Sequence, residues 1–331
     1  MNTRSPVQDG AVWTRADFPE TRSWVQPLTP EMVAELEGAV AKAMAAGGSP
    51  YDLTPQAFDL PIMRPLLEET RRQLEEGRGF AVIGDFPVDS FNYDETLWAY
   101  CGLASYLGDI TAQTRTGIKS VDVLDKGIPY SHQSRGYSSN KLLPFHSDGS
   151  DRVCLLCLET AQEGGLSILA SSPAIYNTIL EERPDLMPIF ERGFYHHRRG
   201  EQPDDESPIS PDRIPVFEFY NDLLHCCYNR NPVNWVEKEG LKLSPEEVEA
   251  LDYFDSVVAR PEMQLPMEMH KGDLQFVNNF VLLHSRTDYI DGPGKRRHLI
   301  RLWLNDATSR RIGPTVQDLY APKFARRRAA S

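Results

Sequence analysis

The chain has no apolar run of 18 residues, the length at which a segment becomes a candidate transmembrane helix. Its first residues, Met1 to Pro6, lack the hydrophobic core of a secretory signal peptide. It has five cysteines, an odd number, and this argues against a framework of disulfides. Together these absences predict a cytoplasmic protein that makes no use of a membrane.

Basic residues are also scarce, because 35 Lys and Arg stand against 48 Asp and Glu, a net charge of −13. Such an acidic chain is a poor partner for nucleic acid or for anionic lipid. The short basic tail at residues 323–328 is interpreted as a solvated end. The chain also shows no internal repeat with the period of a solenoid or a propeller.

Two histidines and one acid form the most informative pattern that is present. His146 and Asp148 are separated by one residue, and His284 follows 136 residues after Asp148 (284 minus 148). Two imidazoles and one carboxylate are the ligand set of a mononuclear non-haem iron site. Since side chains i and i+2 of a strand share a face, we expect His146 and Asp148 to lie on one strand.

A second pattern places two arginines on one strand face downstream of His284. The residues from Arg297 to Leu304 alternate in the way of a strand, so Arg297 and Arg301 are expected to point the same way, together with Leu299 and Trp303. Two arginines that face a metal site can hold a dicarboxylate through paired charge-assisted hydrogen bonds.

As a set, these motifs resemble the Fe(II)/2-oxoglutarate-dependent dioxygenases of the taurine dioxygenase/TfdA-like family, over roughly residues 75–305. The residues that carry the resemblance are His146-x-Asp148, Gly164-Gly165-x-Ser167, Gly272-Asp273, Asn278-Asn279, His284, Arg297 and Arg301. The fold that the resemblance implies is α+β, a double-stranded β-helix (a jelly-roll, cupin-like barrel) with flanking helices.

The resemblance also implies site roles. His146, Asp148 and His284 would bind Fe(II), and O₂ and 2-oxoglutarate would be co-substrates. Arg297, thirteen residues after His284 (297 minus 284), would pair with the C5 carboxylate of 2-oxoglutarate, with Ser167 assisting. Arg301 matches a position that meets the co-substrate or an anionic substrate. Halogenating relatives replace the acid of the triad with a small residue, so the acid retained here favours oxygen chemistry.

We interpret residues 1–331 as a single catalytic domain. Its mainly helical N-terminal part (about 1–110) would pack on the jelly-roll core (about 75–305), followed by the basic tail. Helices are predicted over 30–46, 62–77 and 93–106, and in the insertion over 174–182 and 184–193, with a strand over 216–220.

Three further segments allow a functional and a structural interpretation. Residues 125–137 are polar and marked by Gly and Pro. They form either a long surface connection or an active-site lid that places His132 and Tyr137 against the substrate. The run from His196 to Arg199 is interpreted as surface or local structural residues rather than as ligands. Cys154 and Cys157 are interpreted as buried small hydrophobes.

The function predicted from these patterns is hydroxylation of an unactivated C–H bond of a small molecule, with release of succinate and CO₂. The substrate would be an amino acid, an amine or an organic acid. Desaturation, epimerisation and ring closure start from the same hydrogen abstraction and stay open. Two alternatives are a cupin-like metalloenzyme that works without 2-oxoglutarate, for example a hydrolase that uses Zn or Mn, and a non-catalytic barrel that only binds.

Overall fold

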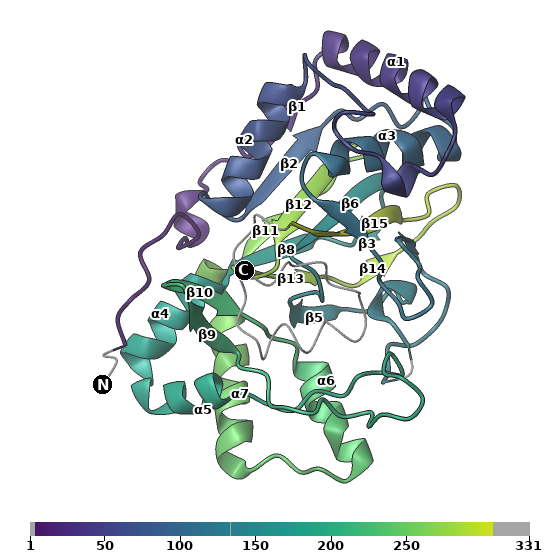
Figure 1. Ribbon diagram of the computed structural model, residues 1–331. Helices are drawn as coiled ribbons and strands as arrows, with labels where there is room; N and C mark the ends of the chain where they lie inside the picture. The colour runs from purple at the N-terminus through teal and green to yellow at the C-terminus, as the bar shows by residue number, and fades with distance from the viewer. Residues whose placement is uncertain (1–3, 133, 307–331) are drawn as a thin grey trace.

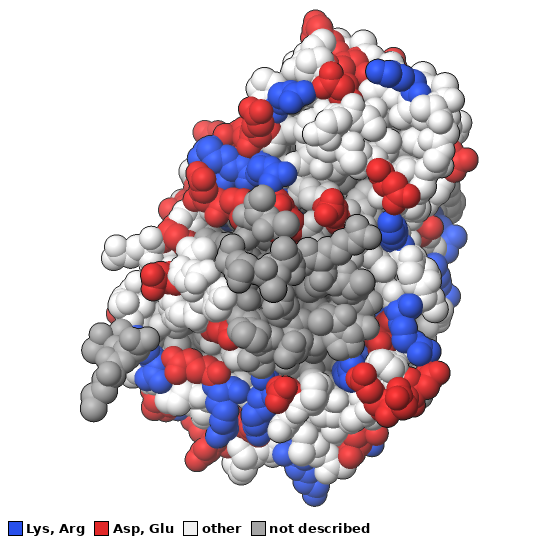
Figure 2. Space-filling view, in the orientation of Figure 1, with Lys and Arg blue, Asp and Glu red and all other residues white. Residues whose placement is uncertain are grey.

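The computed structural model describes residues 4–132 and 134–306, so the basic tail lies outside the described residues. Figure 1 shows the strands in the middle of the molecule, with α1, α2 and α3 on one side and the helices α4 to α7 on the other. On the face drawn in Figure 2, acidic and basic side chains are interspersed over both groups of helices.

The larger sheet has seven strands and is antiparallel except where β1 and β2 pair in parallel. Their order is β1-β2-β12-β6-β15-β3, and β4 also pairs with β15. The strands are β1 (Val25–Pro27), β2 (Phe80–Gly84), β3 (Asp109–Thr111), β4 (Ser120–Val123), β6 (Arg152–Glu159), β12 (Leu274–Asn278) and β15 (His298–Asn305).

The second sheet has four antiparallel strands in the order β11-β8-β13-β5. They are β5 (Leu143–His146), β8 (Ser167–Ser171), β11 (Leu265–Met267) and β13 (Leu282–Arg286). Two small antiparallel pairs complete the strands, namely β7 (Glu163–Gly164) with β14 (Tyr289–Ile290), and β9 (Phe217–Tyr220) with β10 (Leu223–Cys226).

The two sheets pack against each other through one buried apolar cluster. Phe80, Val153 and Trp303 contribute to it from the larger sheet, and Leu169 and Leu282 from the smaller one. Because successive side chains of a strand point to opposite faces, β15 divides its residues between this interior and the outer helices. Leu302 packs in the cluster formed with those helices. The predicted phase is therefore confirmed within β15, over residues 299–304, whereas Arg297 lies just before the strand, ahead of a register shift between His298 and Leu299.

The N-terminal helices cover the outer face of the larger sheet, and two of them begin at a side-chain cap. They are α1 (Pro30–Ala46), α2 (Arg64–Glu75) and α3 (Tyr93–Ser105). Thr29 caps α1 by accepting a hydrogen bond from the Met32 amide, and Asn92 forms a capping box with Glu95. The helix predicted over 62–77 is two residues shorter at each end.

A second helical group covers the outer face of the smaller sheet, from which Ala170 and Leu283 join its core. Its helices are α4 (Ser172–Glu182), α5 (Met187–Arg192), α6 (Arg230–Asn234) and α7 (Pro245–Val258). Short 3-10 helices occur at Arg15–Asp17, Pro50–Asp52, Gly136–Ser138, Pro184–Leu186, Trp235–Glu239 and Pro261–Met263. The helix predicted over 184–193 is thus a 3-10 turn followed by α5.

A buried ionic network joins the N-terminal helices to the loop after β5. Arg152 is fully buried, donates to the Leu107 carbonyl and pairs with Glu75 of α2 and with Asp306 at 3.0 Å. The Asp306 amide in turn donates to the Asp151 carboxylate at 3.0 Å. Because a buried guanidinium is costly unless it is paired, these partners fix one another in place.

All five cysteines lie within the described residues, and all are buried and free of disulfides. Cys154 packs toward the N-terminal helices, whereas Cys157 faces the other side of β6. Burial raises the pKa of the Cys157 thiol to about 12. Both residues therefore act as small apolar side chains, as predicted.

In the part of the chain that the structure describes, no helix is both long and apolar enough to cross a membrane. The organisation as one catalytic domain stays a prediction.

Candidate metal centre and co-substrate pocket

The structure brings His146, Asp148 and His284 together, as the sequence predicted, although not from the elements expected. His146 is the last residue of β5, and Asp148 lies in the loop after it. The expectation that both side chains project from one strand was therefore wrong. His284 lies directly opposite His146 in the β13–β5 pairing, so a cross-strand pair supplies the two imidazoles.

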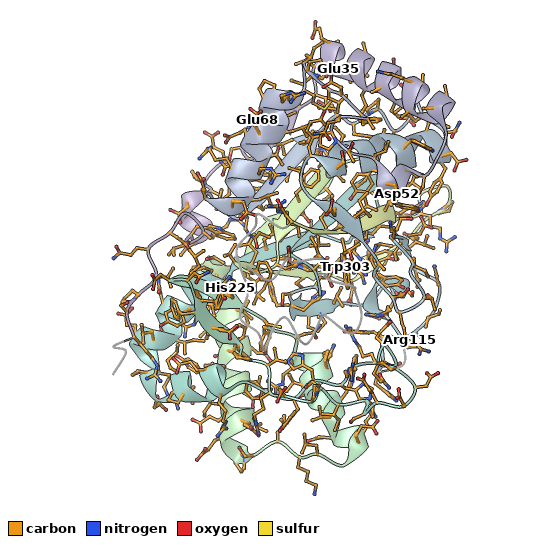
Figure 3. All side chains as sticks on the ribbon, viewed as in Figure 1. Glu35, Asp52, Glu68, Arg115, His225 and Trp303 are labelled. Atoms are coloured by element: carbon orange, nitrogen blue, oxygen red, sulfur yellow. The ribbon has the colours of Figure 1, made fainter. Side chains whose placement is uncertain are left out.

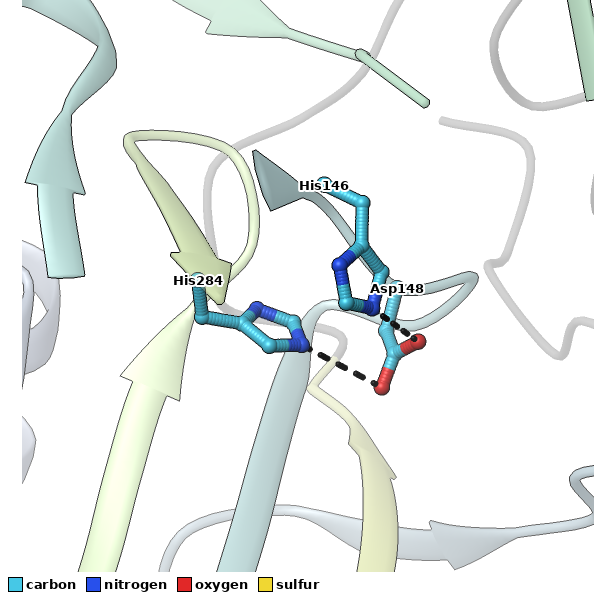
Figure 4. Close-up of side chains that lie close together, drawn as sticks. All are labelled: His146, Asp148 and His284. Carbon is cyan, nitrogen blue, oxygen red and sulfur yellow. Dashed lines mark ion pairs between the residues drawn. The ribbon is translucent and has the colours of Figure 1, made fainter. Parts of the chain in front are cut away.

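The spacing of the three side chains suits one ion. His146 Nε2 lies 3.8 Å from Asp148 Oδ1, and His284 Nε2 lies 3.9 Å from Asp148 Oδ2 (Figure 4). One ligand atom from each residue lies within 4.8 Å of the other two. These gaps are too long for hydrogen bonds, but one ion with bonds of about 2.0–2.2 Å can span them.

Neighbouring groups hold the acid and one histidine in place. His146 Nδ1 lies 2.8 Å from the Pro144 carbonyl, which leaves Nε2 for a metal. Asn279 Oδ1 accepts a hydrogen bond from the Asp148 amide at 3.1 Å, and Trp303 Nε1 donates to Asp148 Oδ2 at 2.9 Å. Asn279 of the sequence motif thus helps to fix the loop that carries Asp148.

The protonation states also suit metal binding. Burial, together with the nearby His146, lowers the pKa of His284 to about 3, and burial lowers the pKa of His146. Burial alone would raise the pKa of Asp148, but Arg301, the two histidines and Trp303 together hold that pKa below its ordinary value. At neutral pH the site therefore offers two neutral imidazoles and one carboxylate.

Arg301 lies beside the acid. Its Nη1 is 3.2 Å from Asp148 Oδ2, and its Nε donates to Gln113 Oε1 at 2.8 Å. The guanidinium also lies 5.1 Å from the centre of the Tyr137 ring. This contact brings Tyr137, from the segment interpreted as a connection or a lid, against a residue that pairs with Asp148.

His132 of the same segment contacts different residues. Its ring packs edge-on against His197 at 5.9 Å and Trp235 at 6.5 Å, centre to centre. The described contacts of His132 thus include none with the triad. The run from His196 to Arg199 was expected at the surface or in local structure, and the first three of its residues are buried. The surface interpretation of these three was wrong, whereas the structural one agrees with their burial.

Arg297 lies just before β15 and is only 5% exposed. In the described part of the chain its Nη1 is buried and has no hydrogen-bond partner, and the guanidinium stacks over the Tyr289 ring at 5.1 Å. Gly165 has φ +73°, and a Cβ there would lie 3.0 Å from Arg297 Nε. The glycine of the Gly-Gly motif therefore leaves room for this arginine.

Ser167 begins β8 and pairs in register with Arg286 of β13. Its hydroxyl donates to Gln275 Oε1 at 3.1 Å, which links the two sheets. Arg286 stacks over the Tyr289 ring at 4.9 Å, and burial lowers its pKa to about 10, with Arg297 contributing. Two arginines thus share one tyrosine ring.

Sequence reasoning missed Gln275, Arg286 and Tyr289. Arg286 follows His284 by two residues, the same-face spacing that was applied elsewhere, and this signal could have found it.

The chain matches known proteins over most of its length. A family model described as "Taurine catabolism dioxygenase TauD, TfdA family" matches residues 48–303. The FR-33289 synthase of Streptomyces rubellomurinus is 33% identical over 319 residues, which cover 93% of each chain. The taurine hydroxylase-like protein SAT17 of Stachybotrys chartarum is 29% identical, over 93% of this chain and 82% of that protein.

Solved structures agree in fold. An asparagine oxygenase in complex with Fe(II), 3-hydroxyasparagine and succinate superposes with a TM-score of 0.65 at 18% identity, covering 86% of this chain and 94% of that one. The non-haem iron oxygenase OrfP with Fe and α-ketoglutaric acid gives 0.63 at 16% identity, over 85% and 94%. Together with the family match over residues 48–303, these findings show that the chain belongs to the TauD/TfdA family of iron- and 2-oxoglutarate-dependent dioxygenases.

Proposed function

We propose that this enzyme oxidises an unactivated C–H bond of a small molecule, most simply to an alcohol, with Fe(II) held by His146, Asp148 and His284. The family match and the convergence of these three side chains support the proposal. When bound, Fe(II) with 2-oxoglutarate and O₂ supplies the oxidising power, and 2-oxoglutarate leaves as succinate and CO₂.

The protein's own residues bind and orient the reactants. Arg297 would pair with the C5 carboxylate of 2-oxoglutarate, because its buried Nη1 has no other described partner. Ser167 would assist by turning its hydroxyl, which now donates to Gln275, toward that carboxylate. Asn279 holds the Asp148 backbone by accepting from its amide, and Trp303 donates to the Asp148 carboxylate, so the two together keep that carboxylate near the histidines.

The observation that carries the proposal is the presence of both a ligand triad and a buried guanidinium, that of Arg297, whose Nη1 has no hydrogen-bond partner among the described residues. A protein that binds only a metal ion has no use for the buried guanidinium of Arg297, which has no counter-charge among the described residues. A buried cation without a partner is costly, and a dicarboxylate co-substrate would relieve that cost. This favours the dioxygenase over the hydrolytic metalloenzyme and over the non-catalytic barrel.

The test is consumption of 2-oxoglutarate by the purified protein. With Fe(II) and O₂, the wild-type protein should form succinate slowly even without the primary substrate, and a metabolite screen should reveal compounds that accelerate it. The Asp148→Ala protein should form none. Binding of Fe(II) without any binding of 2-oxoglutarate would instead support the hydrolytic metalloenzyme, and failure to bind Fe(II) would support the binding protein.

We also infer that the two sheets form the double-stranded β-helix that the sequence predicts. Their antiparallel pairing and the apolar cluster between them support this inference, as does the similarity in fold to the asparagine oxygenase.

A further inference from the structure

Gln113 lies in the turn between β3 and β4 and is buried, with 1% of its surface exposed. A polar side chain is stable in such a place only when its amide is hydrogen-bonded. Nε2 donates to the Lys119 carbonyl at 3.0 Å and to the Arg301 carbonyl at 2.9 Å. Oε1 accepts from Arg301 Nε at 2.8 Å. The amide therefore bonds to both the backbone and the side chain of Arg301.

These contacts fix which way the Gln113 amide points. Its N–H groups face carbonyl oxygens, which only accept, so its oxygen faces the Arg301 guanidinium, which only donates. A flipped amide would place donors against donors at the guanidinium and oxygen against oxygen at the two carbonyls. The orientation of the amide is thus determined, and with it the plane of the guanidinium.

The guanidinium held in this way contacts the metal centre. Arg301 Nη1 lies 3.2 Å from Asp148 Oδ2, the oxygen that also accepts from Trp303 Nε1 at 2.9 Å. The guanidinium lies 5.1 Å from the centre of the Tyr137 ring and 5.0 Å from that of Trp303, which Figure 3 shows among the strands in the middle of the molecule. Direct contacts thus lead from Gln113 through Arg301 to the carboxylate of the triad.

Arg301 needs a second support because its side chain is long and flexible. A single bond from Nη1 to Asp148 would leave the guanidinium free to rotate, whereas a second bond at Nε sets its plane. The amide of Gln113 is also neutral, so it orients the guanidinium without competing with Asp148 for its charge. A carboxylate at position 113 would form an ion pair of its own. A neutral amide is therefore suited to support the contact between Arg301 and Asp148.

We propose that Gln113 is a positioning residue, which acts through Arg301 to hold the Asp148 carboxylate in the orientation that binds Fe(II). The inference rests on the proposed function, in which Asp148 is a metal ligand, and it assigns Arg301 to the metal centre rather than to a substrate anion. Removal of a group that orients a metal ligand typically lowers metal affinity by about 10- to 100-fold. Because Gln113 acts through a second residue, we expect the lower end of this range.

The experiment is a double-mutant cycle on Fe(II) affinity, measured by anaerobic calorimetry with Fe(II) alone. Gln113→Met removes the amide and keeps an unbranched side chain, Arg301→Met removes the guanidinium, and the double variant lacks both. Arg301→Met changes charge as well as orientation, so the quantity compared is the effect of Gln113→Met in each background. If circular dichroism shows that a methionine variant does not fold, Gln113→Ala or Arg301→Lys takes its place.

Thr114→Ala is the matched control for a loosened turn. The Thr114 hydroxyl accepts from the Ile118 amide at 3.3 Å and lies 2.9 Å from Thr116 Oγ1, so its described hydrogen bonds lie within the turn. The next residue, Arg115, is near the edge of the molecule in Figure 3. The control variant therefore weakens the same turn without removing a contact to Arg301.

Gln113→Met should weaken Fe(II) binding about tenfold in the wild-type background and less than about twofold in the Arg301→Met background. Thr114→Ala should bind Fe(II) like the wild type. Three results would overturn the proposal, namely wild-type affinity in the Gln113→Met protein, an equal loss in both backgrounds, and an equal loss in the Thr114→Ala protein. Failure of the proposed function is seen separately, since the wild-type protein would then not bind Fe(II), or the Asp148→Ala protein would bind it equally well.

Discussion

Replacement of Arg297 by alanine tests the co-substrate pocket most directly. The guanidinium is 5% exposed, and among the described residues its Nη1 has no partner, so its charge is available to a ligand. Loss of a buried charge-assisted pair costs roughly 2–5 kcal/mol. The Arg297→Ala protein should therefore bind 2-oxoglutarate more weakly by roughly one to three orders of magnitude.

The assay is anaerobic titration of 2-oxoglutarate into the Fe(II)-loaded protein, followed by calorimetry. The neighbouring Arg296 provides the control, because it is exposed and donates to the Asp125 carbonyl at 2.6 Å. Arg296→Ala should bind 2-oxoglutarate like the wild type. Burial lowers the pKa of Arg297, so the charge is costly in the free protein until an anion pairs with it.

Two outcomes would refute the reasoning about Arg297. One is an affinity of the Arg297→Ala protein for 2-oxoglutarate within about threefold of the wild type, because the loss of a buried charge pair should weaken binding by more than this. The other is an equal loss in the Arg296→Ala protein, which would show that general charge rather than a specific contact attracts the co-substrate. If only Arg301→Ala weakened 2-oxoglutarate, the two same-face arginines would have exchanged roles.

Three further predictions concern the metal centre and the segment beside it. Asp148→Ala should lose Fe(II) in equilibrium dialysis and all turnover while its circular dichroism is unchanged; full activity would remove the triad from the mechanism. Asn279→Ala deletes the acceptor of the Asp148 amide and should lower Fe(II) affinity about 10- to 100-fold. Asn278→Ala is the control, because Asn278 donates to the Leu74 carbonyl and its loss should chiefly lower the melting temperature. Equal Fe(II) affinities in the Asn278→Ala and Asn279→Ala proteins would contradict the role given to Asn279. Tyr137→Ala should raise the ratio of succinate to oxidised product, and His132→Ala should raise it less, while both variants still bind Fe(II) like the wild type. Unchanged ratios and unchanged substrate affinities would show that residues 125–137 are a surface connection and not a lid.

Local patterns predicted the positions of most elements near the site. The alternation along residues 297–304 gave the phase of β15, and the capping residue Thr29 gave the start of α1. The failures arose where distant partners decide the outcome. Asp148 reaches the histidines from a loop, because Asn279 and Trp303 hold it there, and neither contact is visible in the local sequence.

The burial of the run at 196–199 was missed for a similar reason. A stretch of two histidines and two arginines is polar by composition, and polar residues are mostly exposed. In the folded chain, Arg198 pairs with Glu206, and His197 lies against His132 and Glu239. Partners supplied by other segments make the burial possible, and the spacing of the run contains no signal of them.

The network around Arg152 has a consequence for how sequences of this kind can diverge. Glu75 belongs to the N-terminal helical part, whereas Asp306 follows the last strand, and both contact the same fully buried guanidinium. A relative that replaced Glu75 with an apolar residue would have to change Arg152 as well. The N-terminal helices and the sheet residues should therefore be inherited together, and a chimaera that exchanges residues 1–110 between relatives must carry position 152 with them.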